Sequence, residues 1–247
     1  MQINFYEEFP SPENLAKLKL INFKTTLFLA TYSTKEFLKI KNKVGKINKK
    51  ITCAHWPLMK NSYWISPFAN TKDLKGLFKE LNKTKNKILI DLEPPRNKFL
   101  ILKNLFSFHK NKKLIKNFLE ENKQRITTAQ FPPTIFSPLE KLLGLNYKVK
   151  TQKSFMWYSS MIPNFLNKNI RNKLKKIKNK TNISISLGTI AIGILGNEPI
   201  LSPELLEKDL QFIKNFGYNE IIIFRAGGLN KNYLEKINKF TDDKKQK

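Results

Sequence analysis

The chain has 247 residues, of which 40% are hydrophobic and 26% charged, a balance that is typical of a folded protein with a sizeable core. A run of about 18 apolar residues, which a membrane-spanning helix needs, does not occur. The first residues, MQINFYEEFPSPEN, lack the basic and apolar regions of a signal peptide. The single cysteine, Cys53, cannot form a disulfide within the chain, and its place in an expected strand predicts a core position. We therefore expect a cytoplasmic globular protein.

The net charge is +27, because 46 lysines and arginines stand against 19 aspartates and glutamates. Such an excess favours nucleic acid or an anionic membrane surface as a partner. However, almost all of these cations are lysine, whereas bidentate phosphate and base recognition depends on arginine. The densest lysine segments, 110–123 and 168–180, would also not be neighbours in the fold expected below. A nucleic acid partner stays possible, but lysine-coated, solvated helices are favoured.

Eight short segments rich in β-branched and aromatic residues run along the chain, as is typical of strands. Between them lie lysine-rich segments whose apolar residues recur at helical spacing. Several of these begin at a serine that suits a helix N-cap, namely Ser11, Ser33, Ser137 and Ser202. The expected strands cover residues 3–7, 26–32, 51–55, 88–93, 125–131, 153–159, 183–189 and 220–226.

Eight strand-and-helix units in about 250 residues is the count of a (β/α)8 TIM barrel. We therefore predict an α/β fold of one domain, with the barrel over residues 1–240 and a charged, disordered C-terminal tail over residues 241–247. A doubly wound open sheet is the alternative. All twelve prolines and all three tryptophans lie in or enter segments that follow a strand and precede a helix. In a barrel these segments form the face that carries active sites.

The end of the fourth expected strand, ILIDLEPP, carries Asp91 and Glu93. Alternation along a strand places both carboxyls on one side, which in a barrel is the inner side near the mouth. Two close carboxylates repel, so one is expected to keep a proton, as a general acid requires. We predict Glu93 as the acid and Asp91 as the group that orients or polarises it, in a site of the glycoside hydrolase kind. The alternative is structural, with Asp91 bonded to nearby backbone and Glu93 paired with Arg96 or a lysine.

Asp91 and Glu93 resemble the Asp-x-Glu at the end of the fourth strand in chitinase-type (family 18) and lysozyme-type (family 25) glycoside hydrolase barrels. In the chitinase group the full motif is Asp-x-x-Asp-x-Asp-x-Glu. Its first two acidic positions are occupied here by Asn86 and Leu89, so the resemblance covers only the last two.

Met156-Trp157-Tyr158 is similar to the Met-x-Tyr that the chitinase group has on its sixth strand. The resemblance implies that Tyr158 faces an N-acetyl group that assists the reaction. Ser159 stands where that group has an aspartate, which is a departure from the pattern.

Glu198 offers a second arrangement. Many retaining glycosidase barrels place their acid/base on strand four and their nucleophile on strand seven, and Glu93 with Glu198 resembles that layout. Asn197-Glu198-Pro199 also resembles the Asn-Glu-Pro of those enzymes, although that motif belongs to their fourth strand. Glu198 lies far into a loop, so it could equally be a loop carboxylate near a helix start.

Other strand ends supply aromatic, amide and charged side chains. His55 could act as a base or as a donor to substrate, or it could be a packed, hydrogen-bonded residue. The other histidine, His109, lies in a lysine-rich helix, so we expect neither a metal site nor a cofactor. The expected partner is a small-molecule or oligosaccharide substrate. The residues expected to bind it are Trp56, Trp64, Trp157, Gln130, Glu7, Arg225 and Asn197.

Two other functions stay open. Barrels that bind phosphorylated ligands use backbone N–H groups in the loops after strands seven and eight. Gly188 and Thr189 occupy the first loop, and Gly227 and Gly228 the second, with Arg225 able to pair with phosphate. A phosphosugar isomerase or lyase is therefore one alternative. The other is a basic nucleic-acid-binding barrel without enzymatic activity.

Overall fold

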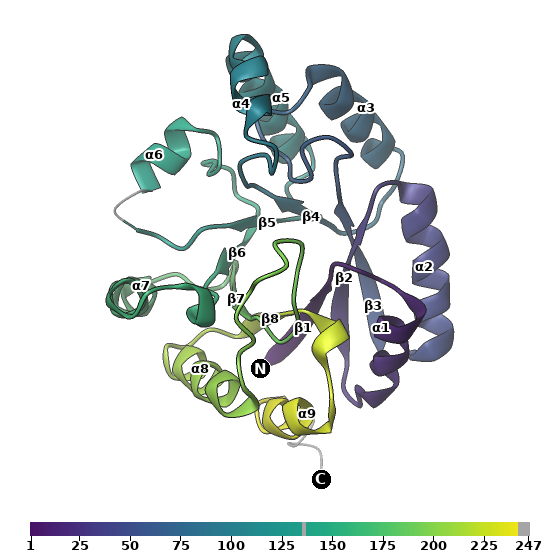
Figure 1. The fold of residues 1–247 in the computed structure, drawn as a ribbon, viewed down its shortest axis with the longest axis vertical. Helices are drawn as coiled ribbons and strands as arrows, with labels where there is room; N and C mark the ends of the chain where they lie inside the picture. Colours follow the sequence, from purple (N-terminus) through teal and green to yellow (C-terminus); the bar gives the residue numbers. More distant parts are fainter. Residues whose placement is uncertain (135–136, 242–247) are drawn as a thin grey trace.

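The computed structural model describes residues 1–134 and 137–241, and its eight parallel strands close into a barrel (Figure 1). Closure comes from β1 and β8, which pair from Gln2 opposite Glu220 to Tyr6 opposite Phe224. The prediction of a (β/α)8 TIM barrel is confirmed, and the open sheet is excluded. The strands are β1 (Gln2–Glu7), β2 (Thr25–Thr31), β3 (Ile51–Pro57), β4 (Ile88–Asp91), β5 (Ile126–Gln130), β6 (Gln152–Met156), β7 (Ile183–Gly188) and β8 (Glu220–Phe224).

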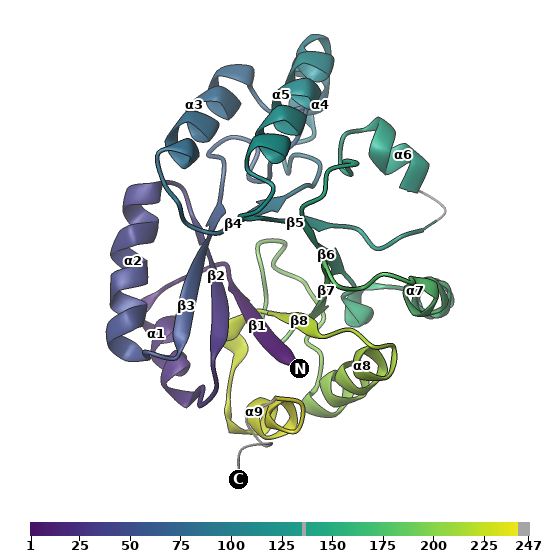
Figure 2. The ribbon, with the colours of Figure 1, turned by 180° about the vertical axis from the view of Figure 1, so that it is seen from behind.

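Helices surround the barrel as an outer ring (Figures 1 and 2). Ser11, Ser33 and Ser202 each accept a hydrogen bond from the backbone N–H three residues later, which satisfies a donor of the first turn. Within the described residues, no helix is long and apolar enough to cross a membrane. The helices are α1 (Pro12–Ala16), α2 (Thr34–Ile47), α3 (Thr71–Asn82), α4 (Phe99–Lys103), α5 (Phe108–Glu121), α6 (Ser137–Leu142), α7 (Asn164–Lys176), α8 (Pro203–Asn215) and α9 (Lys231–Asn238).

Short 3-10 turns occur at Lys17–Leu20, Leu105–Ser107, Ser159–Met161 and Ala226–Gly228. The tail expected over residues 241–247 lies, apart from Thr241, outside the described residues. Its expected disorder therefore stays a prediction.

Alternate strand residues fill the barrel interior. The Tyr6 ring packs against Phe28 and Trp56, with ring centroids 5.6 and 5.5 Å away. Its hydroxyl forms hydrogen bonds with Ser186 at 2.8 Å and Ser154 at 3.3 Å. This layer of rings and hydroxyls fills the middle of the barrel, so the space for a ligand lies nearer the carboxyl ends of the strands.

The opposite sides of the strands pack beneath the helices. Phe78 of α3 and Phe118 of α5 are buried and stack face to face, 4.1 Å apart with 5° between the ring planes. They belong to one apolar cluster with Ile90 and Leu92. The cluster therefore fixes the outer side of β4, the strand whose inner side carries Asp91.

Phe118→Ala should lower the free energy of unfolding by about 3–5 kcal/mol, because it removes a buried ring and leaves a cavity beside Phe78. Phe106→Ala is the matched control, because Phe106 is 101% exposed and its loss should change stability by less than about 0.5 kcal/mol. Urea denaturation followed by circular dichroism measures both changes. Equal losses in the two variants would contradict the packing described here.

Candidate active site

A cavity of about 400 Å³ lies at the carboxyl ends of the strands. Glu8 reaches it from the end of β1, Asp91 and Glu93 from β4, and Glu198 from the loop between β7 and α8. In the described part of the chain, no lysine, arginine or histidine lines this cavity. Other residues of its wall are Trp56, Trp64, Phe131, Glu140, Met156, Tyr158, Thr189, Ile194 and Phe224.

Asp91 and Glu93 share the inner side of β4. The strand ends at Asp91, but the Leu92 N–H still donates to the Ala129 carbonyl at 3.1 Å, so the alternation continues as far as Glu93. Burial, followed by the charges of Glu93 and Glu8, raises the pKa of Asp91 well above its usual range. Burial and the charge of Glu8 raise the pKa of Glu93 to about 7. Asp91 therefore holds a proton and donates it in a hydrogen bond to Glu93.

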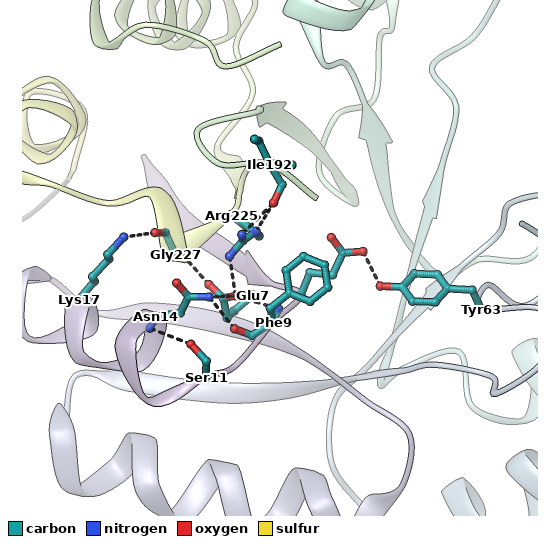
Figure 3. Close-up of polar contacts among 10 residues, drawn as sticks. Glu7, Phe9, Ser11, Asn14, Lys17, Tyr63, Ile192, Arg225 and Gly227 are labelled. Atoms are coloured by element: carbon teal, nitrogen blue, oxygen red, sulfur yellow. Dashed lines mark hydrogen bonds and ion pairs between the residues drawn. The ribbon is translucent and has the colours of Figure 1, made fainter. Parts of the chain in front are cut away.

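Glu8 is a third carboxyl of this cluster, which the sequence analysis did not select. Its Oε1 accepts a hydrogen bond from the Tyr63 hydroxyl at 2.5 Å (Figure 3). Burial raises the pKa of Glu8 to about 7, although the Tyr63 hydrogen bond acts in the opposite sense. Paired backbone hydrogen bonds between Met59 and Tyr63, both 2.9 Å, hold the tyrosine in place. The alternation of Asn4, Tyr6 and Glu8 is the sequence signal that could have identified this residue.

Glu198 is buried against the same cluster by the β7–α8 loop. Its Oε1 accepts a hydrogen bond from the Leu195 N–H at 3.0 Å, and its charge raises the pKa of Glu8. A Cβ atom at Gly193 would lie 2.8 Å from Glu198 Oε1 and 2.9 Å from Glu8 Oε2. Gly193 therefore lets the loop backbone pass close to both carboxyls, and a larger residue would require these side chains to shift.

Aromatic side chains form much of the remaining wall. Tyr158, which follows β6, packs on Phe224 with ring centroids 5.7 Å apart. Burial raises the pKa of Tyr158 well above its usual range, so its hydroxyl stays protonated. Trp56 and Trp64 also line the cavity. The structure therefore brings Asp91, Glu93, Tyr158, Glu198, Trp56 and Trp64 together, as well as Thr189.

His55 lies on the outer side of β3, away from the cavity. Its Nε2 forms a hydrogen bond with the Thr31 hydroxyl at 2.9 Å, and its ring stacks on Phe37 of α2 at 4.7 Å. Burial lowers the pKa of His55 to about 4, so the ring is neutral at pH 7. Its neighbour Trp56, one residue further along the strand, is the one that lines the cavity.

Trp157 and Gln130 also lie outside the cavity lining. Trp157 is fully buried, and its indole N–H donates to Asn167 of α7 at 2.8 Å. The guanidinium of Arg171 lies 5.3 Å from its ring. Gln130 is buried at the end of β5, opposite Phe155, which packs in the outer layer. Trp157 therefore connects the end of β6 to α7, and neither Trp157 nor Gln130 lines the cavity.

Glu7 and Arg225 form an ion pair at the junction of β1 and β8 (Figure 3). Arg225 Nη1 lies 3.1 Å from Glu7 Oε1, and Glu7 also accepts hydrogen bonds from the Phe9 and Gly227 N–H groups. Arg225 donates from Nε and Nη2 to the Ile192 carbonyl at 2.9 and 2.8 Å, and so holds the β7–α8 loop. Asn197 of that loop is exposed and does not line the cavity.

The glycines proposed as a phosphate cradle lie where chain segments approach closely. A Cβ at Gly228 would overlap the Ile190 carbonyl, and one at Gly188 would overlap the Phe224 carbonyl. The Gly227 N–H already donates to the Glu7 carboxylate. Neither Gly188, Gly227 nor Gly228 lines the cavity, whereas Thr189 does.

Residues of the types that bind metal ions are not grouped in the described part of the chain. Among residues 1–134 and 137–241, no set of three or more histidine, cysteine, aspartate or glutamate side chains is placed to hold a metal ion. Cys53 is partly buried and packs against the outer apolar cluster, and burial raises the pKa of its thiol to about 12. At neutral pH this thiol is therefore protonated.

The sequence matches no known family profile, and no curated protein matches it either. Its fold is similar to that of the C-terminal domain of a putative chitinase from Desulfitobacterium hafniense DCB-2, with a TM-score of 0.60, 11% identity and 97% of each chain covered. It is also similar to a class V chitinase from Pseudomonas fluorescens Pf-5, with a TM-score of 0.58, 11% identity, and 97% of this chain and 99% of the other covered.

A xylose isomerase domain protein from Planctomyces limnophilus has a TM-score of 0.57 at 11% identity, with 100% of this chain and 96% of the other covered. At this identity all of these likenesses show the fold alone. Chitinase-type barrels, which the Asp-x-Glu of β4 resembles, are thus among the proteins that share this fold, and so is an isomerase type.

His55→Gln should remove a pH dependence of stability. The unfolded chain protonates this residue near pH 6.5, whereas the folded chain does so only near pH 4, so its contribution to stability is lost as the pH falls through that window. At pH 5 the loss amounts to about 2 kcal/mol. Urea denaturation at pH 7 and pH 5 measures it, and the drop should be smaller by this amount in the variant.

His109→Gln is the control, because His109 is exposed on α5 and its replacement should leave the drop unchanged. The raised pKa values of Glu8 and Glu93 make the protein more stable as the pH falls, which is opposite to the effect of His55. Both residues are present in the wild type and in the two variants, so their effect cancels in the comparison. Identical pH dependence in the wild type and in His55→Gln would contradict the buried, neutral histidine.

Proposed function

We propose that this chain is a carbohydrate-active hydrolase of the glycoside hydrolase type, with Glu93 as the general acid. The observation that carries the proposal is the Asp91–Glu93 pair, with Asp91 buried and Glu93 partly buried, in the lining of a cavity walled by aromatic rings. A pKa of about 7 leaves Glu93 partly protonated at neutral pH, which suits an acid that must protonate a leaving oxygen. Paired carboxylates beside aromatic faces are typical of sugar hydrolysis.

Each member of the cluster has a role in this proposal. Glu93 gives its proton to the glycosidic oxygen. Asp91, which donates a hydrogen bond to Glu93, stabilises the carboxylate that Glu93 then becomes. Tyr158 remains a neutral donor for a polar group of the substrate, and the indoles of Trp56 and Trp64 offer faces for sugar rings.

The charge of the cavity favours a neutral sugar over a phosphorylated ligand. A phosphate group placed here would meet Glu8, Asp91, Glu93 and Glu198 without a cation in the described lining. Arg225, the residue that the sequence analysis named for phosphate, already binds Glu7 and the Ile192 carbonyl. These contacts support the hydrolase proposal over the phosphosugar alternative.

Glu93→Gln should lower kcat/KM by at least about 100-fold, because the amide cannot supply the proton. The measurement uses methylumbelliferyl glycosides of chitobiose, cellobiose and xylobiose as probes, with the melting temperature determined in parallel. Glu120→Gln, on the exposed side of α5, is the control and should retain full activity. Unchanged hydrolysis by Glu93→Gln, or no hydrolysis of any glycoside by the wild type, would refute the proposal.

Glu8→Gln should shift the pH–activity profile. The acid form of Glu93 is lost as the pH rises through its pKa of about 7, which sets the basic limb. Because the charge of Glu8 helps to raise that pKa, removing it should move the basic limb to lower pH. The readout is kcat/KM against pH. A limb that stays in place would show that Glu8 does not act on Glu93.

A further inference from the structure

The segment after β4 exposes a cluster of large apolar side chains. Phe99 is 66% exposed, Leu102 72%, Leu105 55% and Phe106 101%. They lie on α4 and on the 3-10 turn that follows it, within eight consecutive residues. Large apolar groups gathered in this way on a surface mark an interaction site.

The opposite side of the same segment is firmly anchored. The Asn104 amide donates to the Phe68 carbonyl at 2.9 Å, and the Asn111 amide donates to the carbonyls of Pro67 and Ala69 at 2.9 and 2.8 Å. The Phe108 ring packs 5.0 Å from that of Phe68. These contacts fix which side of the segment packs on the protein. The four apolar side chains therefore face the solvent.

The charge around this cluster has one sign. Residues 94–119 contain no aspartate or glutamate. All but one of the cations in this stretch are exposed, the exception being the partly buried Lys112. The seven cations are Arg96, Lys98, Lys103, Lys110, Lys112, Lys113 and Lys116. Among these cations, in the described residues, only Lys116 has an ion-pair partner, Glu120 at 3.5 Å. Exposed apolar side chains among cations that are mostly unpaired are the combination that binds an anionic membrane surface.

Other exposed apolar side chains lie in segments that follow later strands of the barrel. In Figure 1, which shows the end crossed by the β7–α8 loop, α4, α6 and α7 lie along one part of the periphery. Large apolar side chains that are exposed in segments following β5, β6 and β7 are Phe131, Leu139, Leu142, Met161, Phe165, Ile192, Leu195 and Ile200. These segments, like residues 94–119, each follow the carboxyl end of a strand.

We propose that this protein docks peripherally on anionic lipid bilayers, with Phe99, Leu102, Leu105 and Phe106 inserted among the headgroups and the cations of residues 94–119 facing the lipid phosphates. Insertion of the leucines and phenylalanines removes apolar surface from water, and the lysines attract the anionic lipid headgroups, so both groups strengthen binding. A nucleic acid would be attracted by the cations but would leave the apolar side chains in water. Docking is independent of hydrolysis and goes beyond the function proposed above.

Cosedimentation with large unilamellar vesicles tests the proposal on the full chain. Binding should be strong with phosphatidylcholine–phosphatidylserine vesicles, weak with phosphatidylcholine alone, and weaker as salt is added. Leu102→Ser combined with Phe106→Ser should weaken binding by at least about tenfold, because two inserted side chains are lost. Lys98→Gln combined with Lys103→Gln should also weaken binding about tenfold or more.

Matched controls separate this surface from general stickiness and general charge. Leu38→Ser with Phe212→Ser changes two apolar side chains that are 42% and 38% exposed on α2 and α8, and should leave binding unchanged. Lys173→Gln with Lys175→Gln removes the same charge from α7. An equal loss from these control variants would overturn the proposal, as would wild-type protein that ignores anionic vesicles.

Size-exclusion chromatography supplies the remaining outcome. A wild-type dimer that Phe106→Ser dissociates, together with no vesicle binding, would identify the cluster as a self-association surface and refute membrane docking. Circular dichroism and melting temperature should be unchanged in Leu102→Ser with Phe106→Ser, because both side chains are exposed. A loss of lipid binding in a folded variant therefore reports on the surface itself.

Discussion

Alternation of side chains along parallel strands decides which groups reach the cavity. In a closed barrel each strand has one inner and one outer side, so a shift of one residue moves a group from the cavity wall to the layer beneath the helices. Glu8 and Trp56 reach the cavity, whereas the preceding residues, Glu7 and His55, are buried away from it. This constraint sorts the polar groups at the carboxyl ends into a set around the cavity and a set that holds the surrounding loops.

The second set is as important to the site as the first. Arg225 connects β8 to β1 through Glu7 and also binds the Ile192 carbonyl, so it positions the loop that carries Gly193 and Glu198. A buried ion pair of this kind adds little stability over an apolar replacement, but the loss of one partner leaves an uncompensated charge and costs about 3–5 kcal/mol. The geometry of the cavity therefore depends on a pair that does not face the ligand.

Local patterns account for what the sequence could predict. Eight apolar segments separated by helical ones specify the barrel, and the alternation within ILIDLE places Asp91 and Glu93 side by side, because both inferences need only neighbouring residues. Tyr63 could not be found in this way. It reaches Glu8 through a loop that folds back on itself, with a left-handed backbone at Tyr63 (φ 67°), and no periodicity in the sequence encodes that path.

His55 shows a different limit. A polar residue at a strand end is compatible with a site or with a packed position, and the choice depends on whether a helix covers that side. Phe37 of α2 covers it here, which is a tertiary contact that one strand cannot reveal.

The positive net charge of the chain does not determine the pKa values of the carboxyls in the cavity. The chain carries a net charge of +27, yet burial raises the pKa values of Glu8 and Glu93 to about 7. The lysines do not offset this effect, because most of them lie on the outer helices, where water and salt screen their charges over about 8–10 Å. The segment 94–119 is where the cations adjoin a large cluster of exposed apolar side chains, and it begins directly after the strand that carries Asp91 and Glu93. Docking through this segment would hold the cavity next to a membrane surface. β4 would then connect the proposed lipid-binding segment to the carboxyls of the cavity.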